Sequence, residues 1–157
     1  MKKILCLFLI LSVISIISFA EEVYIGEKSL KLLKVKSPTS FEFEEIGFAR
    51  LAGVSGMRSN DEQNEEATKI TSDILKNTVD KDGKLNIKIY KDEKKYKDGK
   101  TRVYYYVIIP IKDSSLEHIL VSKGIASVNS HTKKYFKEDT LKTLEKIAKE
   151  KKLFKWK

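Results

Sequence analysis

The sequence predicts an α+β fold, namely a five-stranded OB-type β-barrel with about three α-helices. Three observations lead to this prediction. Five short segments have the apolar or alternating pattern of strands, a segment with helical periodicity lies between the third and the fourth of them, and two further helical segments follow the fifth. Pro and Gly are sparse and no repeat is visible, so one compact domain is expected.

The first three expected strands lie before the first helix. Residues 30–35 form an apolar run that is closed by Ser37, Pro38 and Thr39. Residues 41–44 alternate Phe with Glu, as a half-buried strand does. Residues 48–54 follow the turn residue Gly47 and form the third strand.

The last two expected strands follow the turn at residues 80–83. In residues 85–90 the apolar side chains of Leu85, Ile87 and Ile89 alternate with polar ones, which predicts a strand with one buried face. Residues 92–100 are charged and predict a hairpin loop. Residues 102–109 are rich in aromatic and β-branched residues, which favour strands.

Three helices are expected from periodicity and capping residues. Residues 65–77 place Ala67, Ile70, Ile74 and Leu75 on one face. Ser114 and Glu117 have the spacing of a capping box, and Gly124 predicts the end of that helix. Asp139 is expected to cap the last helix, whose apolar face carries Leu141, Leu144, Ile147 and Ala148.

Residues 1–20 have the features of a secretory signal. Lys2 and Lys3 precede an apolar run, and Ser18 and Ala20 occupy the small-residue positions before a cleavage point. The alternative is an uncleaved anchor, but the run is short against the roughly 20 residues of a spanning helix. We therefore expect residues 21–27 to form the N-terminal segment of an exported chain, periplasmic or secreted, with no stable membrane span. Residues 28–157 would form a single domain.

The charge and the cysteine content restrict the chemistry. Cys6 is the only cysteine and lies within the expected signal, so the exported chain would have no disulfide, no Cys-based zinc site and no cysteine nucleophile. The chain of 157 residues has a formal charge of +9, and +7 remains without Lys2 and Lys3. A basic chain favours anionic partners such as nucleic acid, although solubility alone also explains such a charge.

Several motifs resemble those of the staphylococcal nuclease (thermonuclease-like) family. Residues 120–128, LVSKGIASV, and residues 145–156, EKIAKEKKLFKW, are similar to the closing helix, strand and last helix of that family. Arg50 and Leu51 followed by Gly53 and Val54 resemble its Arg-Leu-x-Gly-Val-Asp-x-Pro-Glu strand and turn, and Glu66-Ala67 resembles the start of its first helix. The resemblance covers most of residues 28–156 and implies the same barrel with its covering helices.

The resemblance also implies a site, and this chain departs from it. The family's enzymes bind calcium through aspartates, use a glutamate proposed as general base, and bind the phosphate with two arginines. Here Ser55 takes the position of a metal-binding aspartate and Arg58 that of the base, while residues 36–39 retain only the Thr of the other aspartate motif. Arg50 is retained, and Arg102 is the expected second arginine. We therefore expect a degenerate site with no catalytic residue and no bound metal.

Each candidate residue also has a plain structural reading. Arg50, Arg58 and Arg102 could bind an anion, whereas Arg50 could also close the barrel end and Arg102 could be a surface residue. Tyr104 and Tyr106 share one face of a strand and could stack bases or pack in the core. His118 and His131 are isolated and are expected to be packing or surface residues, and the lysines of residues 133–157 alternate with acids as on a solvated helix.

Three functions remain open at this point. The first is an exported, non-catalytic domain that binds nucleic acid, another polyanion or a protein. The second is a divergent secreted nuclease, dependent on a metal such as calcium, that uses other carboxylates; Glu42, Glu44, Glu45 and Asp61 are the nearby candidates. The third is a structural protein of the cell envelope. Whether the chain is an enzyme is therefore not decided by its sequence.

Overall fold

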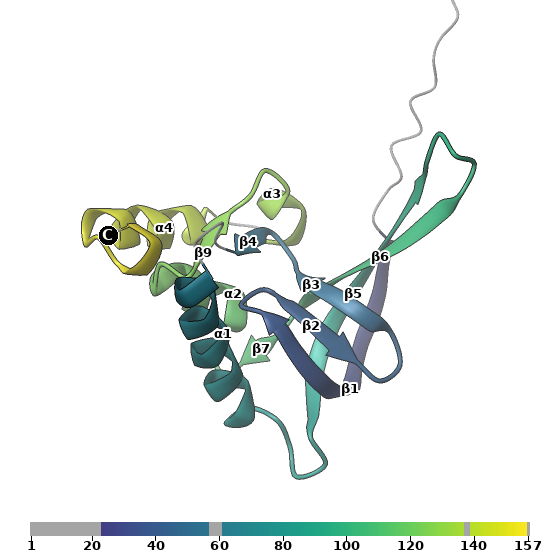
Figure 1. Cartoon of the computed structure of the whole chain (residues 1–157), viewed down its shortest axis with the longest axis horizontal. Helices are drawn as coiled ribbons and strands as arrows, with labels where there is room; N and C mark the ends of the chain where they lie inside the picture. Colours follow the sequence, from purple (N-terminus) through teal and green to yellow (C-terminus); the bar gives the residue numbers. More distant parts are fainter. Residues whose placement is uncertain (1–22, 57–60, 137–138, 157) are drawn as a thin grey trace, which may run out of the picture.

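Five strands form a closed barrel, as the sequence predicts. The computed structural model of the chain describes residues 23–56, 61–136 and 139–156. The strands are β1 (Val23–Ser37), β2 (Ser40–Phe43), β3 (Gly47–Leu51), β5 (Lys84–Lys95) and β6 (Thr101–Ile108), and they close in the order β1-β2-β3-β6-β5 (Figure 1). All neighbouring pairs are antiparallel except β3 and β6, which are parallel.

Strand β1 is longer than the sequence pattern predicts. The expected strand 30–35 is only its second half, because β1 already begins at Val23. Its first half pairs with β5, from Val23 opposite Lys91 to Lys31 opposite Lys84, and its second half pairs with β2. Most residues of the first half are exposed, so no apolar alternation marks it in the sequence. This one strand closes the barrel.

The expected third strand is divided in two. After β3 the chain turns at Gly53, whose φ of 72° favours glycine, and continues as β4 (Val54–Gly56). Strand β4 leaves the barrel and pairs with β9 (Ala126–Val128) in a separate two-stranded sheet. A second small sheet joins β7 (Pro110–Ile111) and β8 (Ser114–Ser115).

The charged segment 92–100, expected as a loop, is mostly strand. Strand β5 continues to Lys95 and pairs with β6 as far as Lys95 opposite Thr101. Only the turn around Asp98 and Gly99 is left as the loop, and Gly99 has a φ of 77°. The hairpin projects beyond the barrel (Figure 1), so neither of its faces needs the apolar alternation by which strands are recognised.

Three longer helices cover the barrel on one side, as expected (Figure 1). They are α1 (Asp61–Lys76), α2 (Leu116–Ser122) and α4 (Thr140–Glu150); α3 (Thr132–Tyr135) and the 3₁₀ turn η1 (Phe154–Trp156) are short. Gly124 ends α2 with a φ of 73°, as predicted. The predicted capping box was wrong. Ser114 belongs to β8, Ser115 is the N-cap residue and makes no side-chain capping bond, and Glu117 is buried.

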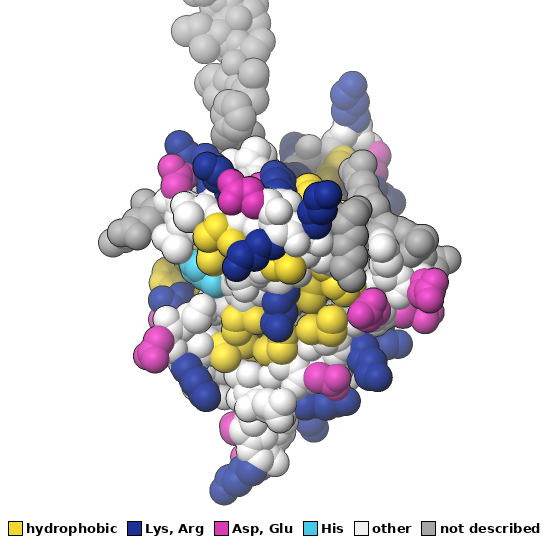
Figure 2. All heavy atoms as spheres, turned by 90° about the vertical axis from the view of Figure 1, so that its left-hand side faces the viewer, with side chains coloured by type: hydrophobic (Ala, Val, Ile, Leu, Met, Phe, Trp, Pro, Cys, Tyr) yellow, Lys and Arg dark blue, Asp and Glu magenta, His cyan; other side chains and the backbone are white. Residues whose placement is uncertain are grey.

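The core lies between the barrel interior and these helices. Its largest fully buried side chains come from the strands, from α1 and α2, and from the segments beside α2: Leu30, Phe41, Phe43, Leu51, Leu75, Leu85, Ile87, Ile89, Ile109, Leu116, Leu120 and Ile125. Figure 2 views the helical side, where a band of hydrophobic side chains is surrounded by charged ones. No helix within the described residues is long and apolar enough to cross a membrane.

Candidate anion-binding cleft on the barrel

One row of residues crosses the outer face of the barrel from strand to strand. Ala49 and Leu51 of β3 point into the core, so Arg50 between them points outward. The strand register places Arg50 opposite Tyr106 of β6, Tyr106 opposite Tyr90 of β5, and Tyr90 opposite Tyr24 of β1. A row of one arginine and three tyrosines follows from the register.

Arg50 lies in a cleft of about 250 Å³ at the junction of β3 and β6. The cleft is lined by the two outward residues of β3, by the turn before it and by the first half of β6: Ile46, Phe48, Arg50, Val103, Tyr104, Tyr105 and Tyr106. The guanidinium carbon of Arg50 lies 5.7 Å from the centre of the Phe48 ring, and Phe48 is 48% exposed. No carboxylate of the described residues forms an ion pair with Arg50. This cation is therefore available to an external anion.

The three consecutive tyrosines divide between the two sides of β6. Tyr105 packs against the core, whereas Tyr104 and Tyr106 alternate with it and point outward. Tyr106 and Tyr90 both contact Tyr135 of α3, with ring centroids 6.4 and 5.0 Å apart, and Tyr24 lies 5.1 Å from Tyr90. Sequence analysis singled out Tyr104 and Tyr106 but missed Tyr24, Tyr90 and Tyr135, which come from three other elements.

Ser55 lies on β4, outside the barrel. Its side chain is exposed, and it pairs with Ser127 of β9. The next residue, Gly56, approaches the turn after β1 so closely that a Cβ there would lie 2.8 Å from the Thr39 hydroxyl oxygen. The two segments in which the resemblance implies metal ligands thus meet. Within the described ranges, no three His, Cys, Asp or Glu side chains come together as a metal site requires.

The other predicted site residues lie apart from Arg50. Arg58 lies outside the described residues. Arg102 is on the projecting hairpin, where its guanidinium is 3.6 Å from Asp98 and 4.4 Å from the centre of the Tyr96 ring. Arg102 precedes Tyr106 by four positions, which corresponds to about 13 Å along the strand. The residues of β6 that flank Arg50 are therefore tyrosines.

The carboxylates proposed for the nuclease alternative do not form a cluster. Glu42 of β2 bonds Lys36 at 2.8 Å, and this hydrogen bond lowers the pKa of Glu42. Glu44 and Glu45 are exposed in the turn between β2 and β3. Asp61 is the first residue of α1, but its side chain is not among those that the structure describes.

Of the two histidines, His118 is a packing residue and His131 is a surface residue. The Nδ1 atom of His118 lies 2.8 Å from the Ser115 hydroxyl, and its ring stands edge-on to Phe136 at 5.3 Å. Burial lowers the pKa of His118. His131 is exposed at the start of α3. Beside His118, the sequence analysis missed Glu117 as a buried residue, although it stands one helical turn before the buried Val121.

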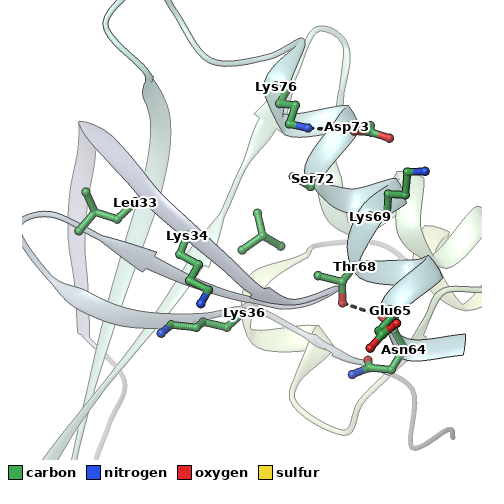
Figure 3. A pocket seen from close by; sticks show the side chains of 11 residues that line it. Leu33, Lys34, Lys36, Asn64, Glu65, Thr68, Lys69, Ser72, Asp73 and Lys76 are labelled. Carbon is green, nitrogen blue, oxygen red and sulfur yellow. Dashed lines mark hydrogen bonds and ion pairs between the residues drawn. The ribbon is translucent and has the colours of Figure 1, made fainter. Parts of the chain in front are cut away.

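A larger and more open depression of about 640 Å³ lies between β1 and α1 (Figure 3). It is lined by Lys34 and Lys36 of β1 and by Glu65, Thr68 and other polar residues of α1. Its charges have both signs, and two of its lysines are already paired, Lys36 with Glu42 and Lys76 with Asp73. Its own carboxylates, Glu65 and Asp73, would compete with an external anion for the lysines, whereas no carboxylate lines the cleft at Arg50, so the cleft is the better candidate.

Comparison with known proteins agrees with the fold. The family model of staphylococcal nuclease homologues matches residues 29–157. No curated protein matches the chain. A domain of this kind suggests a nuclease-like or nucleic-acid-binding function. The match extends over most of the chain and the closed barrel with its covering helices accords with it, so the chain belongs to the family of staphylococcal nuclease homologues.

Proposed function

We propose that this chain is an exported domain that binds single-stranded nucleic acid in the cleft at Arg50 and does not hydrolyse it by the metal-dependent route of its family. One observation supports the proposal most. A cation without a carboxylate partner among the described residues lies over the exposed ring of Phe48 and beside the outward rings of Tyr104 and Tyr106.

The chemistry of the cleft suits a nucleotide. The planar guanidinium can donate two parallel hydrogen bonds to a phosphate. Aromatic rings that lie beside such a cation offer stacking surfaces for a base, as in other barrels that bind single strands. A cleft of about 250 Å³ admits one base or one phosphate group. A duplex keeps its bases stacked inside and could offer only its backbone, so a single strand is the better match.

The proposed lack of hydrolysis rests on residue chemistry. Calcium prefers carboxylate and carbonyl oxygens, and Ser55 offers a single neutral hydroxyl at the implied ligand position. The guanidinium of Arg58 stays protonated at ordinary pH and cannot accept a proton from water. Export is proposed from the signal-like residues 1–20.

The test measures binding and cleavage in parallel on the chain expressed from Glu21, which contains every described element. Fluorescence anisotropy follows the binding of a labelled oligothymidylate. Arg50→Ala should weaken binding about tenfold or more, because it removes a charged hydrogen-bond donor. Arg50→Lys should restore part of the loss, since lysine keeps the charge but not the planar fork.

The matched control is Lys81→Ala, which removes one exposed charge far from the cleft and should leave binding almost unchanged. Incubation with calcium should yield no cleavage. Cleavage that a chelator abolishes and that depends on Arg50 would favour the nuclease alternative. An absence of binding to DNA and RNA would contradict the proposal and favour a structural role.

A further inference from the structure

The hairpin of β5 and β6 extends beyond the barrel as a two-stranded ribbon. Strand β3 pairs with β6 only from Tyr105 to Val107, and β1 reaches β5 only as far as Lys91. From Asp92 to Tyr104 the two strands therefore pair with each other and with no other described strand. This ribbon, residues 92–104, is called the arm below, and Figure 1 shows it projecting on the side away from α1 and α4.

Side-chain contacts stabilise the arm along its length. The hydroxyls of Tyr96 and Tyr104 lie 2.7 Å apart. Arg102 lies over the Tyr96 ring at 4.4 Å, and Lys94 lies 5.6 Å from the centre of the Tyr104 ring. An isolated ribbon is marginal in water, and these cation–π and hydroxyl contacts stabilise it.

The tip of the arm is positively charged. Lys94 is paired with Asp92 at 3.1 Å and Arg102 with Asp98 at 3.6 Å. Lys95, Lys97 and Lys100 form no ion pair with any described residue. All three are exposed; Lys95 and Lys97 flank Tyr96 in the sequence, the Lys100 carbonyl accepts the Tyr96 N–H, and Tyr96 is 37% exposed. Unpaired lysines around an exposed ring are a combination that favours nucleic acid over a neutral partner.

The arm is continuous with the cleft. Arg102, Tyr104 and Tyr106 alternate along β6 and therefore share one face. Tyr104 belongs to both regions, because it lines the cleft and bonds Tyr96 on the arm. The path from Arg50 to the tip is longer than about 13 Å, the distance from Tyr106 to Arg102. A strand held at Arg50 would have to span several nucleotides to reach the tip.

We propose that the arm is a second binding segment for the same single strand, with Lys95, Lys97 and Lys100 at its phosphates and Tyr96 against a base. This inference rests on the proposed function of the cleft. It assigns the chain a long single strand as its ligand, whereas the cleft alone would need only a few nucleotides. It also explains why a charged ribbon projects from the barrel.

The experiment compares two oligothymidylates, one of about four and one of about twelve nucleotides, within the range that such barrels bind. The arm variant carries Lys95→Ala, Lys97→Ala and Lys100→Ala. The control variant carries Lys31→Ala, Lys81→Ala and Lys84→Ala, which remove the same charge from exposed positions at the opposite end of β5. Arg50→Ala reports on the cleft.

The arm variant should bind the long oligonucleotide about tenfold more weakly and the short one as the unmodified chain does. Each lost phosphate contact lowers the salt dependence of binding to a single strand by about 0.7. For the long oligonucleotide, the slope of the logarithm of the binding constant against the logarithm of the salt concentration should therefore become about 2 less steep in the arm variant. The control variant should show neither effect, and Arg50→Ala should weaken the binding of both oligonucleotides.

Other results would overturn the inference in distinguishable ways. One such result is that the arm variant binds both oligonucleotides normally while Arg50→Ala weakens the binding of both. The arm would then have another role, such as contact with a protein, and the proposed function of the cleft would stand. Equal losses in the arm and control variants would show a general effect of charge. If the unmodified chain binds neither oligonucleotide, the proposed function fails and the role of the arm fails with it.

Discussion

At the scale of single residues, Glu117 is the most unusual side chain. It is fully buried in the first turn of α2, and neither carboxylate oxygen has a hydrogen-bond partner among the described residues. Burial disfavours the charged form and raises the pKa of Glu117 from its usual value of 4.5 to about 8. The carboxyl is therefore neutral in the folded chain at pH 7 but ionised in the unfolded chain.

This pKa predicts how stability depends on pH. Between pH 4.5 and about 8 the folded state holds a proton that the unfolded state releases, so the free energy of unfolding falls as pH rises. The loss is roughly 1.4 kcal/mol per pH unit. Glu117→Gln should remove this dependence and stabilise the chain by about 3–4 kcal/mol at pH 7. Urea unfolding at pH 5, 7 and 8 measures the difference.

Glu44→Gln is the control, because Glu44 is exposed. Its unfolding curves should follow those of the unmodified chain at each pH. A constant difference between Glu117→Gln and the unmodified chain across this range would show that Glu117 is ionised in the folded state.

At the scale of elements, Gly124 is the point at which the end of α2 contacts the C-terminal segment at Leu153 and Lys155. Its backbone has a φ of 73°, and its carbonyl accepts a hydrogen bond of 3.3 Å from the N–H of Lys155. A Cβ on Gly124 would lie only 2.5 Å from the carbonyl oxygen of Leu153. Glycine is therefore required here for two reasons, the left-handed backbone and the close approach of the terminal segment.

Two substitutions separate these reasons. Gly83 has the same φ of 73°, but a Cβ there would meet no atom within 4 Å. Gly83→Ala should cost about 1–2 kcal/mol, the price of the left-handed conformation alone. Gly124→Ala should cost a further 1–3 kcal/mol or so, because the terminal segment must move. Thermal unfolding compares the two, and equal losses would show that the segment adapts freely.

At the scale of the whole molecule, closure of the barrel depends on β1. Its first half covers β5 and its second half covers β2. The ring of Tyr24 in the first half also packs on Tyr90, 5.1 Å away. The domain start expected from the sequence, residue 28, falls within this strand.

Truncation tests this dependence. A chain that begins at Lys28 loses the pairs from Val23 to Glu27 and leaves part of β5 as a free edge. Backbone bonds contribute about 0.5–1.5 kcal/mol each and a ring pair about 0.5–1.5 kcal/mol, so we expect a loss of about 2–4 kcal/mol. A chain that begins at Val23 is the control and should keep full stability. Identical urea midpoints for both would show that the barrel closes without this half of β1.

The sequence by itself determined the features that depend on local patterns. Alternation placed Phe41 and Phe43 in the core and put Tyr104 and Tyr106 on one face of a strand, because successive strand residues point to opposite sides. Helical periodicity placed α1 and α4, and Gly124 marked the end of α2 because few other residues adopt a positive φ. The order of these elements was sufficient to predict the barrel.

Only the tertiary structure decided which distant residues meet. The row of Arg50, Tyr106, Tyr90 and Tyr24 depends on the register between four strands, which no local pattern encodes. Register also places tyrosines beside Arg50 and carries Arg102 out to the arm. The burial of Glu117 follows from the packing of α2 on the core, against the usual preference of a carboxylate for water. Local periodicity selects elements, whereas long-range pairing and packing assemble the candidate site.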